Sequence, residues 1–384
     1  VGVGTRRETP NNIGVIHVRF SREDLPEPET FPLMNGKTHR LALAARSEHD
    51  RLFIDVPPGA ESLTVSASAD TPVLSDQLEL QLQRLDFDTA LANPPFTAPA
   101  GNGTVMASAS GGGGQGPAVT VSGGVQAGRW YAVLNNPGSE HASIEIRADV
   151  TSDDAALPIQ PGLWQPSSRP DLYQGYEYNW GGSSRALLWY TYGEDGQPAW
   201  YIAADPASEG NIWTADLYRA TNDGAEQQLA PVGAVSITTL AETDALFSFT
   251  LYGESGTDRM TPSSLMTCPQ VDGSERSYSG IWFRGVDGLG GASVLVNAVT
   301  QTFIHYLFDD TGLPRWILAN GEEDSDPAFT EVPFLQFEGY CAVCPESGVE
   351  YGAAGVMERE FRTESTGEWT LDYVLNPPLR GSVT

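Results

Sequence analysis

The three cysteines are the side chains whose spacing points most directly to chemistry. Cys341 and Cys344 form a Cys-Ala-Val-Cys motif, and Cys268 lies far from both in the sequence. A zinc site normally takes four ligands, and neither a second cysteine pair nor a nearby histidine completes one. A thioredoxin-like redox motif begins a helix, whereas glycine and proline flank this one in a loop-like context. The spacing therefore predicts no metal site and a local disulfide between Cys341 and Cys344, with pairing to Cys268 or free thiols as the alternatives.

No pattern in the sequence predicts a catalytic residue. Gly253-Glu254-Ser255-Gly256 resembles the nucleophile turn of trypsin-like proteases, but none of the five histidines has the context of those enzymes' catalytic histidine. We interpret the segment as a turn after a β-strand. The sequence holds no nucleophile elbow, phosphate loop or dinucleotide motif, and nothing singles out a carboxylate pair for glycoside hydrolysis. We therefore expect a protein that is not an enzyme and has no cofactor.

A duplication dominates the second half of the chain. The two copies open with Gly162-Leu163-Trp164 and Gly280-Ile281-Trp282, and three hairpin residues recur in register: Gly196, Pro198 and Trp200 match Gly312, Pro314 and Trp316. A glycine between two apolar runs predicts a tight turn with positive φ. The acidic neighbours Glu194, Asp309 and Asp310 could bind a cation, but calcium takes six or more oxygens. We interpret them as solvated turn carboxylates.

The strands around this hairpin carry bulky side chains on both faces. Because side chains alternate along a strand, Leu188, Tyr190 and Tyr192 share one face, and their counterparts in the second copy are also bulky. This face is predicted to be the core. The opposite face carries Trp189 and, on the return strand, Tyr201. We predict that these two rings form a contact surface for another domain, a protein partner or a sugar ring; packing against the neighbouring copy is the alternative.

The composition excludes several partners. Of 384 residues, 50 are acidic and 21 basic, which gives a formal net charge of −29 with Lys37 as the single lysine. Such a surface repels the phosphates of nucleic acids and anionic lipids, so we expect no nucleic-acid partner. No apolar stretch approaches the length of a membrane-spanning helix, so we expect no membrane insertion. The sequence begins at Val1 without a signal peptide, which suggests a processed mature form or a fragment.

The block over residues 38–150 has the turns and alternating strands of a β-sandwich. Val56-Pro57-x-Gly59 followed by Leu63-x-Val65, with Gly128-x-Trp130-Tyr131 near the end, resembles the bacterial pre-peptidase C-terminal (PPC) domain of secreted proteases. The resemblance implies a jelly-roll sandwich in about this block. The family's aspartate-rich element is replaced by Leu78 to Leu82, which leaves calcium binding open.

The two copies are similar to an uncharacterised repeat of secreted proteobacterial proteins with Gly-x-Trp, Asp-Gly-x-Pro-x-Trp and a late Cys-x-x-Cys-Pro. Gly-x-Trp openings also occur in calycin barrels. Short β-branched and aromatic runs between glycine and proline turns predict an all-β protein, each copy an antiparallel meander closed as a barrel or folded as a sandwich. The expected organisation is a sequence of five parts: a lead-in over 1–37 with a strand at Ile13 to Phe20, the PPC-like sandwich over 38–150, a linker over 151–161, and the copies over 162–270 and 271–384.

These features favour a secreted, extracellular or cell-surface protein that acts by association with a protein partner or with itself, as an adhesion, matrix or filament subunit. Two alternatives remain at this point. The chain could be the accessory C-terminal region of a secreted serine protease, which would account for the PPC resemblance, or a lectin that binds glycans.

Overall fold

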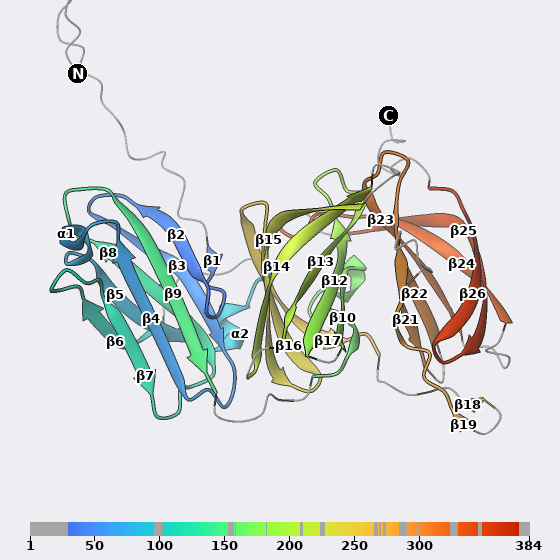
Figure 1. The fold of residues 1–384 in the computed structure, drawn as a ribbon, viewed down its shortest axis with the longest axis horizontal. Helices are drawn as coiled ribbons and strands as arrows, with labels where there is room; N and C mark the ends of the chain where they lie inside the picture. The colour runs from blue at the N-terminus through green and yellow to red at the C-terminus, as the bar shows by residue number, and fades with distance from the viewer. Residues whose placement is uncertain are drawn as a thin grey trace, which may run out of the picture.

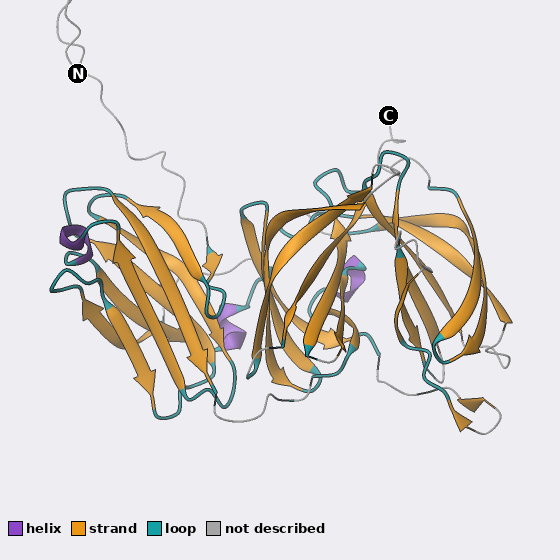
Figure 2. Ribbon diagram, viewed as in Figure 1, coloured by secondary structure: helices purple, strands orange, loops and turns teal. Residues whose placement is uncertain are grey.

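The computed structural model describes residues 30–95, 101, 103–152, 157, 159–181, 183–207, 210–222, 227–264, 268, 270–271, 274–283, 290–297, 300–322, 329–344 and 348–375. The protein is all-β, as predicted: a sandwich, a closed barrel and a half-barrel sheet follow one another along its long axis (Figures 1 and 2). No helix among the described residues is long and apolar enough to span a membrane. The strand expected at Ile13 to Phe20 lies outside the described residues.

The sandwich packs a sheet of order β1-β3-β8-β5-β6 on a sheet of order β2-β9-β4-β7. Its strands are β1 (Phe31–Pro32), β2 (Thr38–Leu43), β3 (Ser47–Val56), β4 (Ser62–Ala69), β5 (Glu79–Leu85), β6 (Thr104–Ser110), β7 (Ala118–Ser122), β8 (Gly128–Asn136) and β9 (Ala142–Thr151), and its short helices are α1 (Pro72–Ser75) and α2 (Phe87–Ala90). Strand β9 shows why the sequence folds this way, because Ile144, Ile146 and Ala148 alternate with exposed residues and fill the core. β1 and the buried Leu33 belong to this sandwich, ahead of the boundary expected at residue 38.

The first copy is a barrel in which each strand pairs with the next and β10 pairs with β17 to close it. Its elements are β10 (Gly162–Pro166), the 3-10 helix η2 (Pro170–Leu172), β11 (Gly175–Gly181), β12 (Ser184–Tyr192), β13 (Pro198–Pro206), β14 (Ile212–Asn222), β15 (Gln227–Ala241), β16 (Asp244–Leu251) and β17 (Glu254–Pro262). The segment compared with a protease turn leads from β16 into β17, and the Ser255 hydroxyl donates to the carbonyl of Thr30.

The second copy repeats the order of the first seven strands of the barrel in a sheet that, over the described residues, is open. A small hairpin, β18 (Gln270–Val271) and β19 (Ser274–Glu275), precedes β20 (Gly280–Phe283), β21 (Gly291–Val296), β22 (Thr300–Phe308), β23 (Pro314–Glu322), β24 (Phe329–Glu338), β25 (Glu350–Thr363) and β26 (Thr366–Tyr373). β26 occupies the place of β16. Within the described residues, no counterpart of β17 joins β26 to β20, so the sheet is a half-barrel with two free edges.

Each Gly-x-Trp motif starts a strand in the same way. Gly162 and Gly280 have φ of 110° and 138°, a region that favours glycine. The indole N–H of Trp164 then donates to the carbonyl of Gln160 at 2.9 Å, and Trp282 donates to Tyr278 at 2.9 Å. The motif therefore fixes the first strand of each copy by a local hydrogen bond, which makes the two starts equivalent.

The sandwich joins the barrel through polar contacts along β16 and β17. Arg129 and Asp55 form a buried ion pair at 2.8 Å, and the hydroxyl of Ser248 on β16 donates to the same Asp55 carboxylate at 3.0 Å. The amide of Thr257 on β17 donates to the carbonyl of Pro95 at 3.0 Å. The sandwich thus contacts the outer face of β16 and β17, the last two strands of the barrel.

Candidate functional site

Trp189 and Tyr201, the predicted contact residues, lie inside the closed barrel. Their exposed fractions are 3% each, and the Trp189 ring packs on Tyr201, Phe247 and Phe249 with centroids 5.6, 5.2 and 4.6 Å apart. The prediction that they form a contact surface is therefore wrong. Both faces of β12 and β13 are apolar because both are buried. The face predicted to be a contact surface lies in the barrel interior, and the face predicted to be the core contacts the second copy.

The face predicted to be the core is the interface between the two copies. Leu188, Tyr190, Tyr192 and Trp200 pack in one cluster with side chains of β21, β22, β23 and β24. The partners from the half-barrel are Leu295, Ile304, Tyr306, Trp316 and Phe337. Packing against the neighbouring copy was the alternative considered for Trp189 and Tyr201. The residues that pack in this way are instead those on the opposite face of β12 and β13.

A buried carboxyl group adjoins this interface. Glu177 on β11 is fully buried, and burial raises its pKa to about 8. Asn179 donates to one of its oxygens at 2.5 Å. Burial raises the pKa values of Tyr190 and Tyr306, one tyrosine from each copy, and the nearby Glu177 carboxylate raises them further. Glu177 is therefore neutral at and below neutral pH, which suits a position surrounded by apolar rings.

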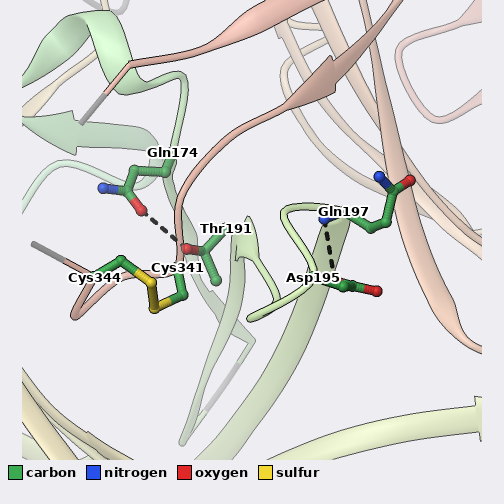
Figure 3. The surroundings of a disulfide bond; sticks show 6 residues. All are labelled: Gln174, Thr191, Asp195, Gln197, Cys341 and Cys344. Carbon is green, nitrogen blue, oxygen red and sulfur yellow. Dashed lines mark hydrogen bonds between the residues drawn. A yellow bond between two sulfur atoms is a disulfide. The ribbon is translucent and has the colours of Figure 1, made fainter. Parts of the chain in front are cut away.

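The Cys341–Cys344 disulfide predicted from the spacing is present, with sulfur atoms 2.07 Å apart, and Cys268 is free. Figure 3 shows Gln174 and Thr191 of the first copy in its surroundings, joined by a 2.9 Å hydrogen bond. Ala342, inside the disulfide loop, is buried in the core of the closed barrel. The loop between β24 and β25 thus packs on the first copy.

Among the described residues, no group of three or more histidine, cysteine, aspartate or glutamate side chains is placed to hold a metal ion. Asp309 accepts from the amides of Thr311 and Leu313 at 2.9 and 3.0 Å and pairs with Arg315 at 2.8 Å. Glu194 and Asp310 are exposed. Gly196 and Gly312 have φ of 78° and 80°, which confirms the predicted turns.

The half-barrel presents the apolar surface that the closed barrel conceals. Register with the preceding strand makes Leu371 and Tyr373 of β26 the counterparts of Phe249 and Leu251 of β16, since Tyr373 pairs with Gly355 as Leu251 pairs with Gly233. Phe249 and Leu251 are 0% and 7% exposed, whereas Leu371 and Tyr373 are 39% and 37% exposed. These side chains are exposed because no strand among the described residues pairs with the outer edge of β26.

A pocket of about 910 Å³ lies beside these exposed side chains. Alternate residues of β26 line one wall of the pocket, and Trp282 and Phe283 of β20 line another. The turn after β22 forms the rim. The Trp282 and Trp369 rings lie 5.4 Å apart, and Phe283 is 76% exposed. We call this pocket, together with the edges of β20 and β26 that pair with no described strand, the open side.

Polar groups at the open side differ between its base and its rim. His305 is buried at the base, where burial lowers its pKa to about 3, so it is neutral above acidic pH. The indole N–H of Trp369 is buried without an acceptor among the described residues. The rim is acidic, with Asp309, Asp310 and Glu368. The site thus combines an apolar wall, two strand edges and negative charge.

Comparison with known proteins gave no assignment. No family model matches the chain, and no curated protein matches it. The resemblance to the PPC domain and to the uncharacterised repeat therefore stays a prediction. The sequence analysis did not identify the open side, because the residues of β17 themselves have little strand-like alternation whose absence after Tyr373 could be noticed.

Proposed function

We propose that this protein is non-catalytic and acts by association with another polypeptide, which adds a β-strand at the open side. The observation that carries the proposal is the exposure of Leu371 and Tyr373 at positions that are buried in the closed copy. An unpaired strand edge offers backbone donors and acceptors, and an adjacent apolar wall offers side-chain pockets. A strand bound there would take the place that β17 has in the first copy.

Two further features support an extracellular or cell-surface setting. The Cys341–Cys344 disulfide suits an oxidising compartment. The net charge of −29 keeps such a protein soluble and repels nucleic acid, so that association depends on a defined complementary segment. We propose that the association serves assembly or adhesion, with the three β-domains as the structural body.

A glycan is the second ligand class that the site favours, because the partly buried rings of Trp282 and Trp369 and the carboxylates at the rim are groups that sugar-binding sites use. The strand is preferred, since the open side provides two backbone edges and a glycan would leave both unpaired.

Hydrogen exchange with a strand-like probe tests the proposal. The probe is a synthetic decapeptide that alternates valine and threonine, added to the intact chain. At a concentration where the chain is monomeric, we expect the amides of β20 and β26 that face away from β21 and β25 to exchange quickly and to become protected with the peptide. Leu371→Asp should abolish the protection, and Thr370→Asp, its outward-facing neighbour, should retain it.

Protection by oligosaccharides but by no peptide would replace the proposal with the glycan alternative. Cleavage of peptide or glycan substrates by the purified protein would contradict the non-catalytic part of it.

A further inference from the structure

We infer that the strand accepted at the open side comes from a second copy of this chain, from residues Ile13 to Phe20. This inference rests on the proposed function and names its partner. Two copies joined in this way would leave one free donor on one copy and one free acceptor on the other, so the product would be a head-to-tail chain of subunits.

The sequence of the segment fits the requirements of the open side. The acceptor needs an extended strand with one apolar face for the half-barrel interior and backbone groups free for both edges. In Ile13 to Phe20, the residues Ile16, Val18 and Phe20 share one face, and His17 and Arg19 share the other. This alternation has the period of a half-buried strand.

Charge complementarity favours the same segment. Residues 1–20 hold Arg6, Arg7 and Arg19 against one acidic residue, Glu8, in a chain that is strongly acidic as a whole. The rim of the open side carries the exposed carboxylates of Asp310 and Glu368, the second of which also pairs with Arg362. A locally basic strand next to an acidic rim gains attraction, whereas most other segments of this chain would be repelled.

The position of the sandwich favours a second copy over the same chain as donor. Described residues begin at Thr30, in the sandwich, and the half-barrel lies at the opposite end of the molecule with the closed barrel between them (Figure 1). Residues 21–29 link the segment to Thr30, and nine residues span at most about 32 Å when fully extended. To reach its own open side, the segment would have to pass the whole closed barrel.

The residues that follow β26 are a poorer donor. The stretch 376–384 contains Pro377 and Pro378, which have no backbone N–H to give, and its other apolar residues are Leu379 and Val383. A strand between two neighbours needs donors on both sides, and proline is confined to edges and strand starts. This tail is nevertheless included as an outcome of the test.

The test is a mixing experiment with two variants of the full chain, followed by analytical ultracentrifugation. The donor variant is Val18→Asp, with Val15→Asp on the opposite face as its control. The acceptor variant is Leu371→Asp, with Thr370→Asp as its control. We expect the wild-type mass to rise with concentration, each variant alone to remain monomeric with an association constant reduced at least about tenfold, and each control to assemble.

The equimolar mixture of the two variants should stop at a heterodimer, because only one intact donor and one intact acceptor remain in it. This result would show that donor and acceptor lie on different subunits. A wild-type mass that rises beyond that of a dimer would identify a head-to-tail contact, since a reciprocal two-fold contact stops at a dimer. Unchanged melting temperatures show that the variants fold.

Three outcomes would overturn the inference. A wild-type chain that stays monomeric while the amides of β26 are protected would place the tail or the chain's own N-terminal segment at the open side. Assembly that survives Val18→Asp but is lost in Leu371→Asp would assign the donor to another segment and leave the proposed function standing. Assembly that survives Leu371→Asp would remove the open side from the contact, and with it the support for both.

Discussion

Trp200 and Trp316 make the same hydrogen bond in opposite directions across the interface between the two copies. The indole N–H of Trp200 donates to the carbonyl of Leu307 at 3.1 Å, and that of Trp316 donates to the carbonyl of Thr191 at 2.7 Å. Thr191 and Leu307 occupy the same position in β12 and β22, directly before Tyr192 and Phe308. The rings repeat the relationship: Trp200 lies 5.8 Å from Tyr306, and Trp316 lies 5.7 Å from Tyr190. The interface therefore has approximate two-fold symmetry.

Trp200→Phe and Trp316→Phe should destabilise the protein by similar amounts. Each change leaves a buried carbonyl without its donor and removes part of a buried ring, which together cost about 2 to 4 kcal/mol. Urea unfolding followed by circular dichroism measures this. Trp180→Phe is the matched control, because Trp180 is 42% exposed and should change stability little. Losses that differ strongly between the two variants would contradict the symmetry.

Trp189→Ala should unfold or strongly destabilise the closed barrel, because the ring is packed on three other aromatic rings in its interior. A buried tryptophan replaced by alanine costs about 3 to 5 kcal/mol. Thermal melting checks this, with Tyr252→Ala at a 55% exposed position as the control. A variant that melts like the wild type would return Trp189 to the surface, as the sequence interpretation had it.

Glu177→Gln should change how stability depends on pH. The folded protein holds the Glu177 proton more tightly than the unfolded chain, since burial raises the pKa from 4.5 to about 8. The wild type therefore loses stability from this group as pH rises from about 4.5 to about 8, with no further loss above that range. Each pKa unit corresponds to about 1.4 kcal/mol, so the effect amounts to a few kcal/mol.

The glutamine variant keeps the acceptor for Asn179 and cannot ionise. Its unfolding free energy, measured in urea at several pH values, should fall less than that of the wild type between acidic and alkaline pH. Parallel curves for the two proteins would show that Glu177 does not titrate across this range.

Reduction of the Cys341–Cys344 disulfide should have a modest effect. The cysteines are separated by three positions, and the chain-entropy model gives about 2 kcal/mol for so short a loop. The loss should appear in the barrel and half-barrel together, because Ala342 packs in the barrel core. The Cys341→Ser, Cys344→Ser double variant tests this by thermal melting, with Cys268→Ser as the control. A fall well beyond this size would assign the disulfide a larger role than closing the loop.

The sequence predicted what local patterns determine. The turns at Gly196 and Gly312, the equivalence of Trp200 and Trp316, the all-β class and the Cys341–Cys344 pair all depend on short-range spacing, and the structure agrees with each. The sequence does not indicate which face of β12 points into the barrel. Leu188 and Trp189 are adjacent and both apolar, so alternation places them on opposite faces. It does not show which face lies in the barrel interior and which lies at the interface with the second copy.

The open side could not be predicted from short sequence patterns either. Whether a meander closes depends on pairing between its first and last strands, β10 and β17 in the first copy, which are distant in the sequence. The residues of β17 are mostly small or polar and show little of the alternation typical of a strand, although β17 completes the barrel. Its presence in one copy and absence from the described part of the other left no strong sequence signature.

The two-fold relationship at Trp200 and Trp316 has a consequence for how such a molecule could have arisen and grown. A surface that binds its own equivalent is satisfied by one partner, so a single-copy ancestor would have formed a closed pair, and fusion of two genes would have made that pairing permanent within one polypeptide. Because the two equivalent faces bury each other, neither is left to bind a further subunit, and this contact cannot build a larger assembly. The two copies differ in one respect: the first is a closed barrel, and the described part of the second is an open sheet. This difference makes the two ends of the duplicated region unequal and gives the molecule a direction.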